Sequence, residues 1–591
     1  MGSFLSDARA SPENMLIVEV SSNSYERLIK LAPRALEIPF LATMGPVFVT
    51  AGFAALVIVY GVYRRYTRIS LTDVPGPDSA SFIMGNMKEL YQGQAAEADF
   101  KWQAQYGNVI RFKSAFGEDQ LMISDPAALQ YIFVKSGYRF PKQCDRRVLS
   151  QMINGKGIIW ADGDDHKRQR RVMLPGFGAP ESKAFLSLFK GCAESMSNKW
   201  TDIISNSKEQ SAVLNVSAWL SRATLDAIGQ GTCYAGSTIT FLSSCFSAAF
   251  DIRFSSIDNN ESALGHSYRN MMTDAFGSQS DSQIFFQGVS KYIPPRVLEY
   301  FANTSKNPRV VRIRETGSVA TSVAKQMVKD KAEMLLQGKG SRDVFSLLVK
   351  ANMDTDAKAK LTEEELFAQM RTILFAGHET TSNTVSFALL ELAKHPEIQS
   401  RLRAEIWETE AAVHARGDVD FTIADFEAMT YTTAVMKEVL RYCCIVYHVH
   451  RYASQDDVLP LSQPITTRSG DVIYELPVPK GTRIVASIAA YNRNKELWGE
   501  DAHVFNPDRW LDGTAKEKKA TSIGVYSNLM TFIGGVRACI GWRFAVIEIQ
   551  AFLTEIVGKF EFAPTDKTER IRREACLVMT PTVAPRNDKE Y

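Results

Sequence analysis

The chain has 591 residues, 45% of them hydrophobic, so it can bury a large core. Its formal net charge of +2 argues against nucleic acid as the main partner. The eight cysteines show no paired spacing, which fits a reducing compartment better than a disulfide scaffold.

The first part of the chain divides into a polar tail and an apolar run. Residues 1–37 have no basic start leading straight into an apolar stretch, so they do not read as an ordinary signal peptide. Residues 38–63 contain no charged side chain, and a helix of about 20 apolar residues suffices to span a bilayer. They predict a single transmembrane anchor, with a buried core helix as the alternative. Basic residues flank the run on both sides, so charge alone does not give the topology.

A hinge and one large domain are predicted after this run. Residues 64–78 are basic and contain the stiff, non-helical segment Asp73-Val74-Pro75-Gly76-Pro77. No repeat or Pro/Gly-rich linker divides the rest, so residues 79–591 are expected to form one domain.

Short strands and a loop are predicted next. Val109–Phe112 and Gln120–Ser124 read as strands, and Asp125 before Pro126 predicts a helix start. Residues 139–159 show no clean period, so we expect a long loop there.

A helix with a basic face is predicted to open within residues 160–171, where acidic side chains suit the first turn. His166 and Arg170 are four residues apart and share one face, which is either a binding face or an ordinary solvated one. Lys167 and Arg171 share a neighbouring face and are candidates for docking an acidic protein.

Residues 180–350 are mostly helical in pattern. Several phenylalanines there are candidates for lining an apolar pocket or for the core: Phe246, Phe250, Phe254, Phe285 and Phe286.

A long helix is predicted from the capping-box sequence that begins at Thr362 to His395. Inside it lies the segment Ala376-Gly377-His378-Glu379-Thr380-Thr381. Glycine and threonine are locally unfavourable in the middle of a helix, so the segment points to a function, with a simple flaw in the helix as the alternative.

The next helix, expected to begin near Ala424, carries Glu438 and Arg441. Residues three apart face the same side and can pair, although an exposed pair of this kind would contribute little. The segment Cys443-Cys444-Ile445-Val446-Tyr447-His448-Val449-His450 follows and raises the possibility of a zinc site. Adjacent cysteines do not match the separated pairs that usually bind zinc, which argues against it. Residues 478–482 predict a turn between two strands.

The segment Phe532-Ile533-Gly534-Gly535-Val536-Arg537-Ala538-Cys539-Ile540-Gly541 precedes a predicted helix over 542–556. The helix N-terminus is expected to favour a thiolate at Cys539, and Gly535 and Gly541 to let the backbone fold tightly around the sulfur. A soft thiolate without a cysteine partner suits one iron atom. A buried structural cysteine is the alternative.

The Cys539 segment resembles the haem-binding loop of the cytochrome P-450 family, the haem-thiolate monooxygenases, and the chain looks most like its eukaryotic microsomal, fungal members. The 376–381 segment resembles the oxygen-activation motif of that family. The resemblance implies a mainly α fold with minor β structure, preceded by a single N-terminal transmembrane helix.

The resemblance also implies roles for particular residues. Cys539 would be the axial ligand of the iron in haem b. Thr380 and Glu379 would relay protons during oxygen activation, and Gly377 would let the helix open locally. Further residues implied at the haem are Arg537, Phe532, Gly535, Gly541, His166, Arg170 and Arg451. A bracing network is implied for Glu438, Arg441 and Arg509, and a substrate pocket for Phe375, Ala376, Val446, Val449 and Met579.

The implied activity is the insertion of one oxygen atom from O2 into a lipophilic substrate, in secondary metabolism such as terpenoid biosynthesis. Electrons would come from NADPH through a flavoprotein, the NADPH–cytochrome P-450 reductase. The protein would be anchored in the endoplasmic reticulum membrane by one span, with the catalytic domain in the cytosol. Glycosylation at Asn215, Asn260 or Asn303 would instead place that domain in the lumen. The alternatives are a haem-thiolate isomerase or dehydratase that needs no external electrons, and a non-enzymatic membrane haem-binding protein.

Overall fold

The structure, a computed structural model, describes residues 52, 55, 59, 70–233, 257, 263–337, 344–353, 359–511 and 522–584. The chain forms two compact units, residues 1–68 and residues 69–591. The predicted anchor over 38–63 lies outside the described residues except at three positions, and among the described helices none has the length and apolar character needed to span a bilayer.

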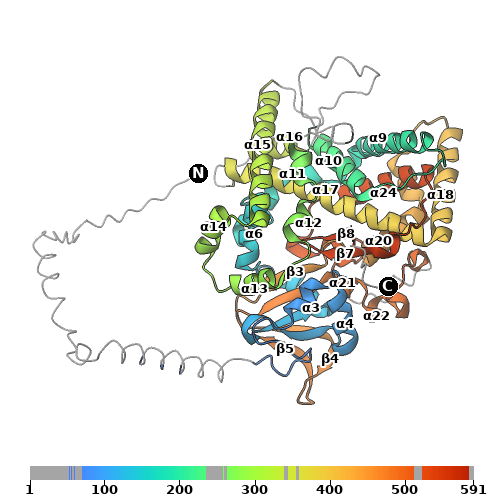
Figure 1. The fold of residues 1–591 in the computed structure, drawn as a ribbon. Coiled ribbons are helices and arrows are strands. Elements are labelled where there is room, and N and C mark those ends of the chain that lie inside the picture. Colours follow the sequence, from blue (N-terminus) through green and yellow to red (C-terminus); the bar gives the residue numbers. More distant parts are fainter. Residues whose placement is uncertain are drawn as a thin grey trace, which may run out of the picture. The chain divides into compact units, whose positions relative to one another are not determined.

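The larger unit is mainly helical, as predicted (Figure 1). The helices up to residue 233 are α3 (Met87–Gln92), α4 (Glu97–Tyr106), α5 (Pro126–Gln130), α6 (Cys144–Asn154), α7 (Gly163–Met173), α8 (Ala179–Ala184), α9 (Leu186–Ser205) and α10 (Val216–Cys233). Those between residues 263 and 353 are α11 (Ala263–Tyr268), α12 (Met271–Phe276), α13 (Asp281–Ser290), α14 (Pro295–Thr304), α15 (Pro308–Leu336) and α16 (Val344–Met353). The later ones are α17 (Glu363–Lys394), α18 (Pro396–Ala415), α19 (Ile423–Ala428), α20 (Thr430–Tyr442), α21 (Ile488–Asn492), α22 (Lys495–Trp498) and α24 (Trp542–Lys559).

The strands form three small sheets. They are β1 (Val109–Lys113), β2 (Asp119–Ile123), β3 (His448–Tyr452), β4 (Asp457–Thr466), β5 (Val472–Val478), β6 (Arg483–Ser487), β7 (Ile571–Ala575) and β8 (Met579–Val583). One sheet has the order β1-β2-β6-β3, in which only β2 and β6 are parallel, and the other two are the hairpins β4-β5 and β7-β8. The predicted strands near residues 109 and 120 and the predicted turn over 478–482 are confirmed.

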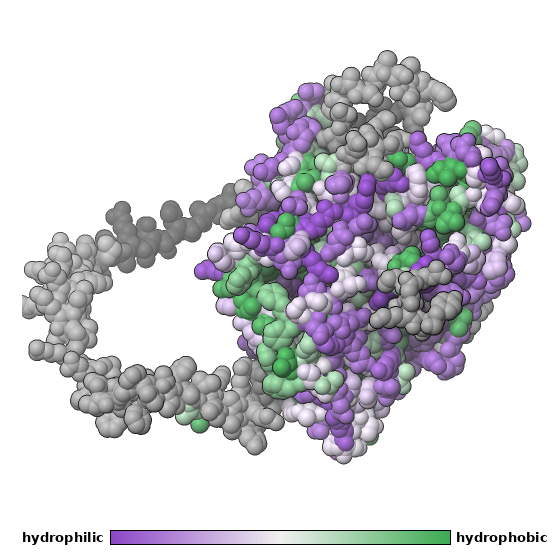
Figure 2. All heavy atoms as spheres, in the orientation of Figure 1, coloured by the Kyte–Doolittle hydropathy of each residue, from purple (hydrophilic) through white to green (hydrophobic). Residues whose placement is uncertain are grey.

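Helix α17 runs through the centre of the helical part and packs against α10, α15 and α24 (Figure 1). Its start is the predicted capping box, in which the Thr362 hydroxyl accepts from the Glu365 N–H at 3.2 Å and the Glu365 carboxylate accepts from the Thr362 N–H at 2.9 Å. Among the described residues, hydrophobic ones gather on the surface over α13 and α14 (Figure 2).

Two predictions of local structure are wrong. The segment expected to be a loop over 139–159 contains helix α6, and the helix expected to begin near Ala424 is broken at Met429 into α19 and α20. In both places a distant side chain caps a helix end. Arg371 of α17 donates to the carbonyls of Met152 and Ile153 at the end of α6, and the Glu405 carboxylate of α18 accepts from the first N–H groups of α20.

Candidate active site

Cys539 lies in the turn that precedes α24. Its N–H donates to the carbonyl of Phe532 at 2.8 Å, which closes the loop on itself. Gly535 has a φ of +69°, and a Cβ there would lie 2.0 Å from the carbonyl oxygen of Phe133. Only glycine fits this position, because both the backbone conformation and the available space exclude a side chain.

The structure corrects two expectations about this loop. Gly541 has an ordinary φ of −93°, and a Cβ there would meet nothing closer than the Phe177 ring at 3.7 Å, so no tight fold requires it. Burial raises the pKa of the Cys539 thiol, although the N–H of Gly541 and the charge of Arg170 act in the opposite direction. The helix N-terminus alone therefore does not make a thiolate; a cation at the sulfur would have to supply the rest. The side chain is nonetheless accessible, so its sulfur can be reached by a ligand.

Positive charge is buried beside this loop around one carboxylate, that of Asp162. Arg537 forms an ion pair with Asp162, and the backbone N–H of Lys142 donates to it at 2.7 Å. Burial and the charge of Arg537 lower the pKa of Arg451 to about 9. Burial, followed by the charge of Arg451, also lowers the pKa of Lys142 well below its usual value. The Nε atoms of Arg451 and Arg537 are buried without a hydrogen-bond partner.

His166 and Arg170 both lie at this cluster, but they do different things. The Nδ1 of His166 is 2.8 Å from the Tyr138 hydroxyl, and burial together with the nearby cations lowers the pKa of His166 to about 3, so the imidazole is neutral. Arg170 donates to the carbonyl of Ala538 at 2.8 Å and thus holds the loop itself. Lys142, Tyr138 and Asp162 were missed by the sequence analysis, because nothing in their spacing indicates that they meet.

The chemistry of these donors fits haem. An accessible sulfur is a ligand for iron, and three buried cations that share one carboxylate call for further negative charge, which the two propionates of haem would supply. The residues that would hold the propionates are Lys142, Arg451 and Arg537, with Tyr138 and His166 beside them.

The predicted oxygen-activation segment lies inside α17 without interrupting it. A Cβ at Gly377 would lie 2.7 Å from the Ile228 side chain, so the glycine allows α10 to approach closely. The Thr380 hydroxyl donates to the carbonyl of Ala376 at 2.7 Å, and the Thr224 hydroxyl of α10 donates to the carbonyl of His378 at 3.0 Å. These bonds engage helix carbonyls from the side, which loosens the local ladder of backbone bonds.

Glu379 is buried and turned toward His378, whose Nε2 lies 3.4 Å from its Oε1. His378 is fully buried, donates or accepts through Nδ1 at the carbonyl of Leu374 at 2.8 Å, and lies 4.7 Å from the Tyr268 ring. The carboxylate thus has a polar neighbour that can exchange a proton with it.

Thr381 and Glu548 form a contact that the sequence analysis missed. The Thr381 hydroxyl donates to Oε2 of Glu548 on α24 at 2.9 Å, while Oε1 is buried without a partner. Burial raises the pKa of Glu548 to about 8, so the acid is neutral at pH 7. This contact joins the helix after Cys539 to the residue next to Thr380.

Glu438, Arg441 and Arg509 are brought together in the core. Arg441 donates to both carboxylate oxygens of Glu438, at 2.9 and 2.7 Å, and Arg509 donates to one of them at 3.1 Å. The pair of Glu438 and Arg441 is fully buried. Removing one partner of such a pair typically costs about 3–5 kcal/mol, because the other charge is left uncompensated.

The network reaches the Cys539 loop through Asn492, another residue that the sequence analysis missed. Arg441 donates to the carbonyl of Asn492 at 3.0 Å. The Asn492 side chain donates to the Thr531 hydroxyl at 2.8 Å and accepts from the Met530 N–H at 3.0 Å. Thr531 precedes Phe532, so the buried ion pair fixes the start of the loop.

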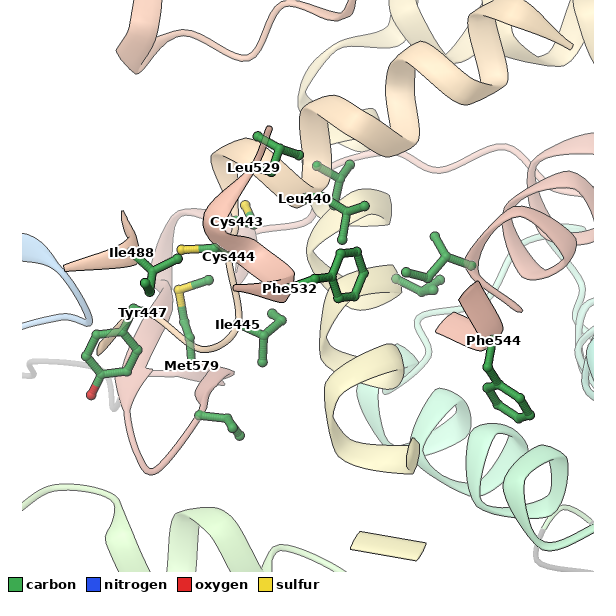
Figure 3. Close-up of a cluster of buried hydrophobic side chains, with 14 of the residues drawn as sticks. Leu440, Cys443, Cys444, Ile445, Tyr447, Ile488, Leu529, Phe532, Phe544 and Met579 are labelled. Carbon is green, nitrogen blue, oxygen red and sulfur yellow. The ribbon is translucent and has the colours of Figure 1, made fainter. Parts of the chain in front are cut away.

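The residues predicted to form a substrate pocket lie on three elements. Phe375 and Ala376 are on α17, Val446 and Val449 lie before and in β3, and the Met579 N–H donates to the carbonyl of Ile445 at 2.8 Å. Phe532, Ile445 and Met579 belong to one hydrophobic cluster with Cys443 and Cys444 (Figure 3). The two adjacent cysteines are thus core residues.

Comparison with known proteins gives one consistent result. The profile of the family described as Cytochrome P450 matches residues 74–235 and 238–584. The chain is 31% identical to cytochrome P450 monooxygenase 91 of Postia placenta, covering 85% of this chain and 90% of that protein. It is 32% identical to cytochrome P450 monooxygenase 205 of the same fungus, covering 92% of this chain and 96% of the relative. It is also 32% identical to a ganoderic acid synthetase of Ganoderma lucidum, covering 87% of this chain and 92% of the relative.

The buried acid Glu548 should leave a mark on the pH dependence of stability. Between an unfolded pKa of 4.5 and a folded pKa of about 8, the folded acid keeps a proton that the unfolded chain has released. The free energy of unfolding should therefore fall as pH rises through this window. Gln is neutral throughout, so Glu548→Gln should lose several kcal/mol less than the wild type between pH 5 and 8, at about 1.4 kcal/mol per pKa unit. Urea unfolding at several pH values measures this, with the exposed Glu410→Gln as control; parallel curves for all three proteins would contradict it.

Proposed function

The chain belongs to the cytochrome P450 family and is a haem-dependent monooxygenase, and we propose that it oxidises a lipophilic compound of secondary metabolism, such as a terpenoid. The observation that carries this proposal is the meeting of an accessible Cys539 with buried, undercompensated cations at the start of α24. The ganoderic acid synthetase among the relatives supports a role in the making of a natural product.

We assign the work of holding haem to residues of this chain. Cys539 ligates the iron, while Arg451, Arg537 and Lys142 bind the propionates and keep the group in one orientation. The bound haem supplies the chemistry that activates O2 and transfers one oxygen atom to the substrate. The electrons come from NADPH through a flavoprotein reductase, and the exposed Lys167 on α7 belongs to the face proposed for its docking.

Proton delivery is assigned to Thr380 and Glu379. The Thr380 hydroxyl can exchange its bond to the Ala376 carbonyl for one to a molecule bound beside α17. Glu379 holds a proton that it can share with His378, 3.4 Å away. Phe375, Ala376, Val446, Val449 and Met579 are apolar, so the substrate surface that they contact is apolar as well.

A membrane location at the endoplasmic reticulum is also proposed, with residues 38–63 as the single span and the catalytic domain in the cytosol. A second feature supports it: an exposed apolar patch on α13, α14 and the segment before α3 (Figure 2). The patch consists of Phe82, Ile83, Phe116, Phe285, Phe286, Tyr292, Val297, Tyr300 and Phe301, with exposures from 38% to 71%. Phe285 and Phe286 are thus surface residues, and neither core nor pocket; the other three phenylalanines predicted for these roles lie outside the described residues.

The patch fits a lipid surface by its chemistry. Phe116 gathers the rings of Phe82, Phe285 and Tyr292 at 6.1 to 6.3 Å, so the aromatic groups form one continuous area. Large exposed apolar areas are uncommon on soluble proteins, and aromatic residues favour the membrane interface. Phe82 also follows the apolar run over 38–63 closely in sequence, which keeps the patch within reach of the bilayer.

Loss of the sulfur ligand tests the central assignment. Cys539→Ala should abolish the absorption band of the thiolate–iron–CO complex and all turnover with NADPH and reductase, because alanine offers no ligand. Cys144→Ala, at an exposed cysteine, is the control and should keep both. A Cys539→Ala protein that keeps the band would disprove the assignment.

Loss of the Thr380 hydroxyl tests proton delivery. Thr380→Ala should keep its haem and its CO band but release more hydrogen peroxide per NADPH, because protons no longer arrive in the right order. Thr384→Ala removes a similar hydroxyl, bonded to the Thr380 carbonyl at 2.8 Å, and serves as the matched control. Equal peroxide yields from the two variants would reject the role of Thr380.

Amide hydrogen exchange tests the membrane face. In the full chain reconstituted in lipid nanodiscs, amides of α13 and α14 should exchange several-fold more slowly than in the double variant Phe286→Asp, Tyr300→Asp, because charge prevents insertion. Val419→Asp, at an exposed residue elsewhere, should behave as the wild type. Identical exchange in all three would remove the lipid contact.

A further inference from the structure

A pocket of about 190 Å³ lies among α6, α14, α15 and α17, away from Cys539. Its volume corresponds to roughly six water molecules at about 30 Å³ each. The lining contains two arginines, Arg314 and Arg371, together with the polar residues Asn303, Ser318 and Thr321, and it contains no acidic residue. A site of this composition selects negative charge.

Arg371 is the deeper of the two cations. Its Nη2 donates to the carbonyls of Met152, at 3.2 Å, and Ile153, while its Nε is buried without a hydrogen-bond partner. Burial lowers the pKa of Arg371, and the only other group that acts on it is the phenol of Tyr268. Among the described residues, no carboxylate pairs with this guanidinium.

Helix capping accounts for only part of what the two arginines offer. Arg371 satisfies carbonyls at the end of α6, and Nη1 of Arg314 donates to those of Ala302, Asn303 and Ser305 at the end of α14. Each uses one nitrogen for this purpose. Within the described part of the chain, the remaining guanidinium nitrogens of both residues make no hydrogen bond, and five donors in a fixed fork suit an oxyanion.

Gly317 on α15 leaves the room that the site needs. A Cβ there would lie 2.7 Å from Nη2 of Arg371 and 3.0 Å from the carbonyl oxygen of Met152. Glycine inside a helix costs about 1 kcal/mol relative to alanine, so the position is locally unfavourable. Its effect is to let the guanidinium lie between α15 and α17.

The pocket adjoins the residues assigned to the substrate. Arg371 and Phe375 are four apart on α17 and share a face, and Phe375 lies 6.4 Å from the ring of Tyr268, the group that senses the charge of Arg371. Thr380 follows nine residues after Arg371, about 13.5 Å along the helix axis. An anion bound at Arg371 would therefore leave its apolar body beside Phe375.

We propose that Arg371, with Arg314, binds the carboxylate of an amphipathic substrate, so that the carbon oxidised lies remote from the acid group. This inference rests on the proposed function, because it names the substrate class of that site. It adds a polar anchor to a pocket otherwise described by its apolar lining.

Equilibrium dialysis of the full-length, haem-loaded protein against radiolabelled palmitic acid, methyl palmitate and acetate tests the proposal. The wild type should bind palmitic acid at least tenfold more tightly than the methyl ester, and acetate only weakly. Arg371→Gln should lose this roughly tenfold preference and keep its affinity for the ester. Arg403→Gln is the matched control, because Arg403 also donates to main-chain carbonyls, those of Val557 and Phe560, far from the pocket.

A second pair of variants guards against misfolding of Arg371→Gln. Ser318→Asp places a carboxylate in the pocket lining and should abolish the preference for the acid, whereas Ser322→Asp, one turn further along the exposed side of α15, should not. Equal affinity of the wild type for acid and ester, acetate binding as tight as palmitate binding, or a preference unaffected by Ser318→Asp would each overturn the proposal. Because dialysis requires no turnover, failure of the monooxygenase assignment would show instead as a missing CO band.

Discussion

Buried positive charge beside the Cys539 loop is the constraint on which the rest of the structure depends. Lys142, Arg451 and Arg537 lie together with one carboxylate, that of Asp162, and burial lowers the pKa values of the first two. Uncompensated charges inside a protein are costly, so the folded chain favours a partner that brings negative charge. Binding of an anionic cofactor and completion of the fold are therefore linked, and stability measured with and without it should not be treated as one quantity.

The same loop is held from the opposite side by a network with balanced charge. Glu438 and Arg441 are fully buried and satisfied, and Asn492 carries their order to Met530 and Thr531 just before Phe532. One side of the loop is thus rigid in the chain by itself, while the other is left for a ligand to complete. This division suits a site that must keep its sulfur in place before the cofactor arrives.

Local signals predicted local structure well. The capping box at Thr362 gave the start of α17, and Asp125 before Pro126 gave the start of α5, because both signals act within one helical turn. The two wrong segments share a different cause: α6 ends on Arg371 and α20 begins on Glu405, caps that come from distant parts of the chain. The site shows the same limit. Spacing pointed to Cys539, Thr380 and the Glu438 pair, whereas Lys142, Asp162, Asn492 and Glu548 act through contacts that no short window contains.

The glycine at position 317 has a consequence for how the protein can diversify. Its missing side chain sets the distance between α15 and the Arg371 guanidinium, so the width of that pocket is written in the backbone. Single-base changes turn a glycine codon into one for alanine, serine, valine or aspartate, each of which would narrow or recharge the space in one step. Selectivity at this entrance is thus open to rapid evolutionary change while the iron-binding loop stays untouched.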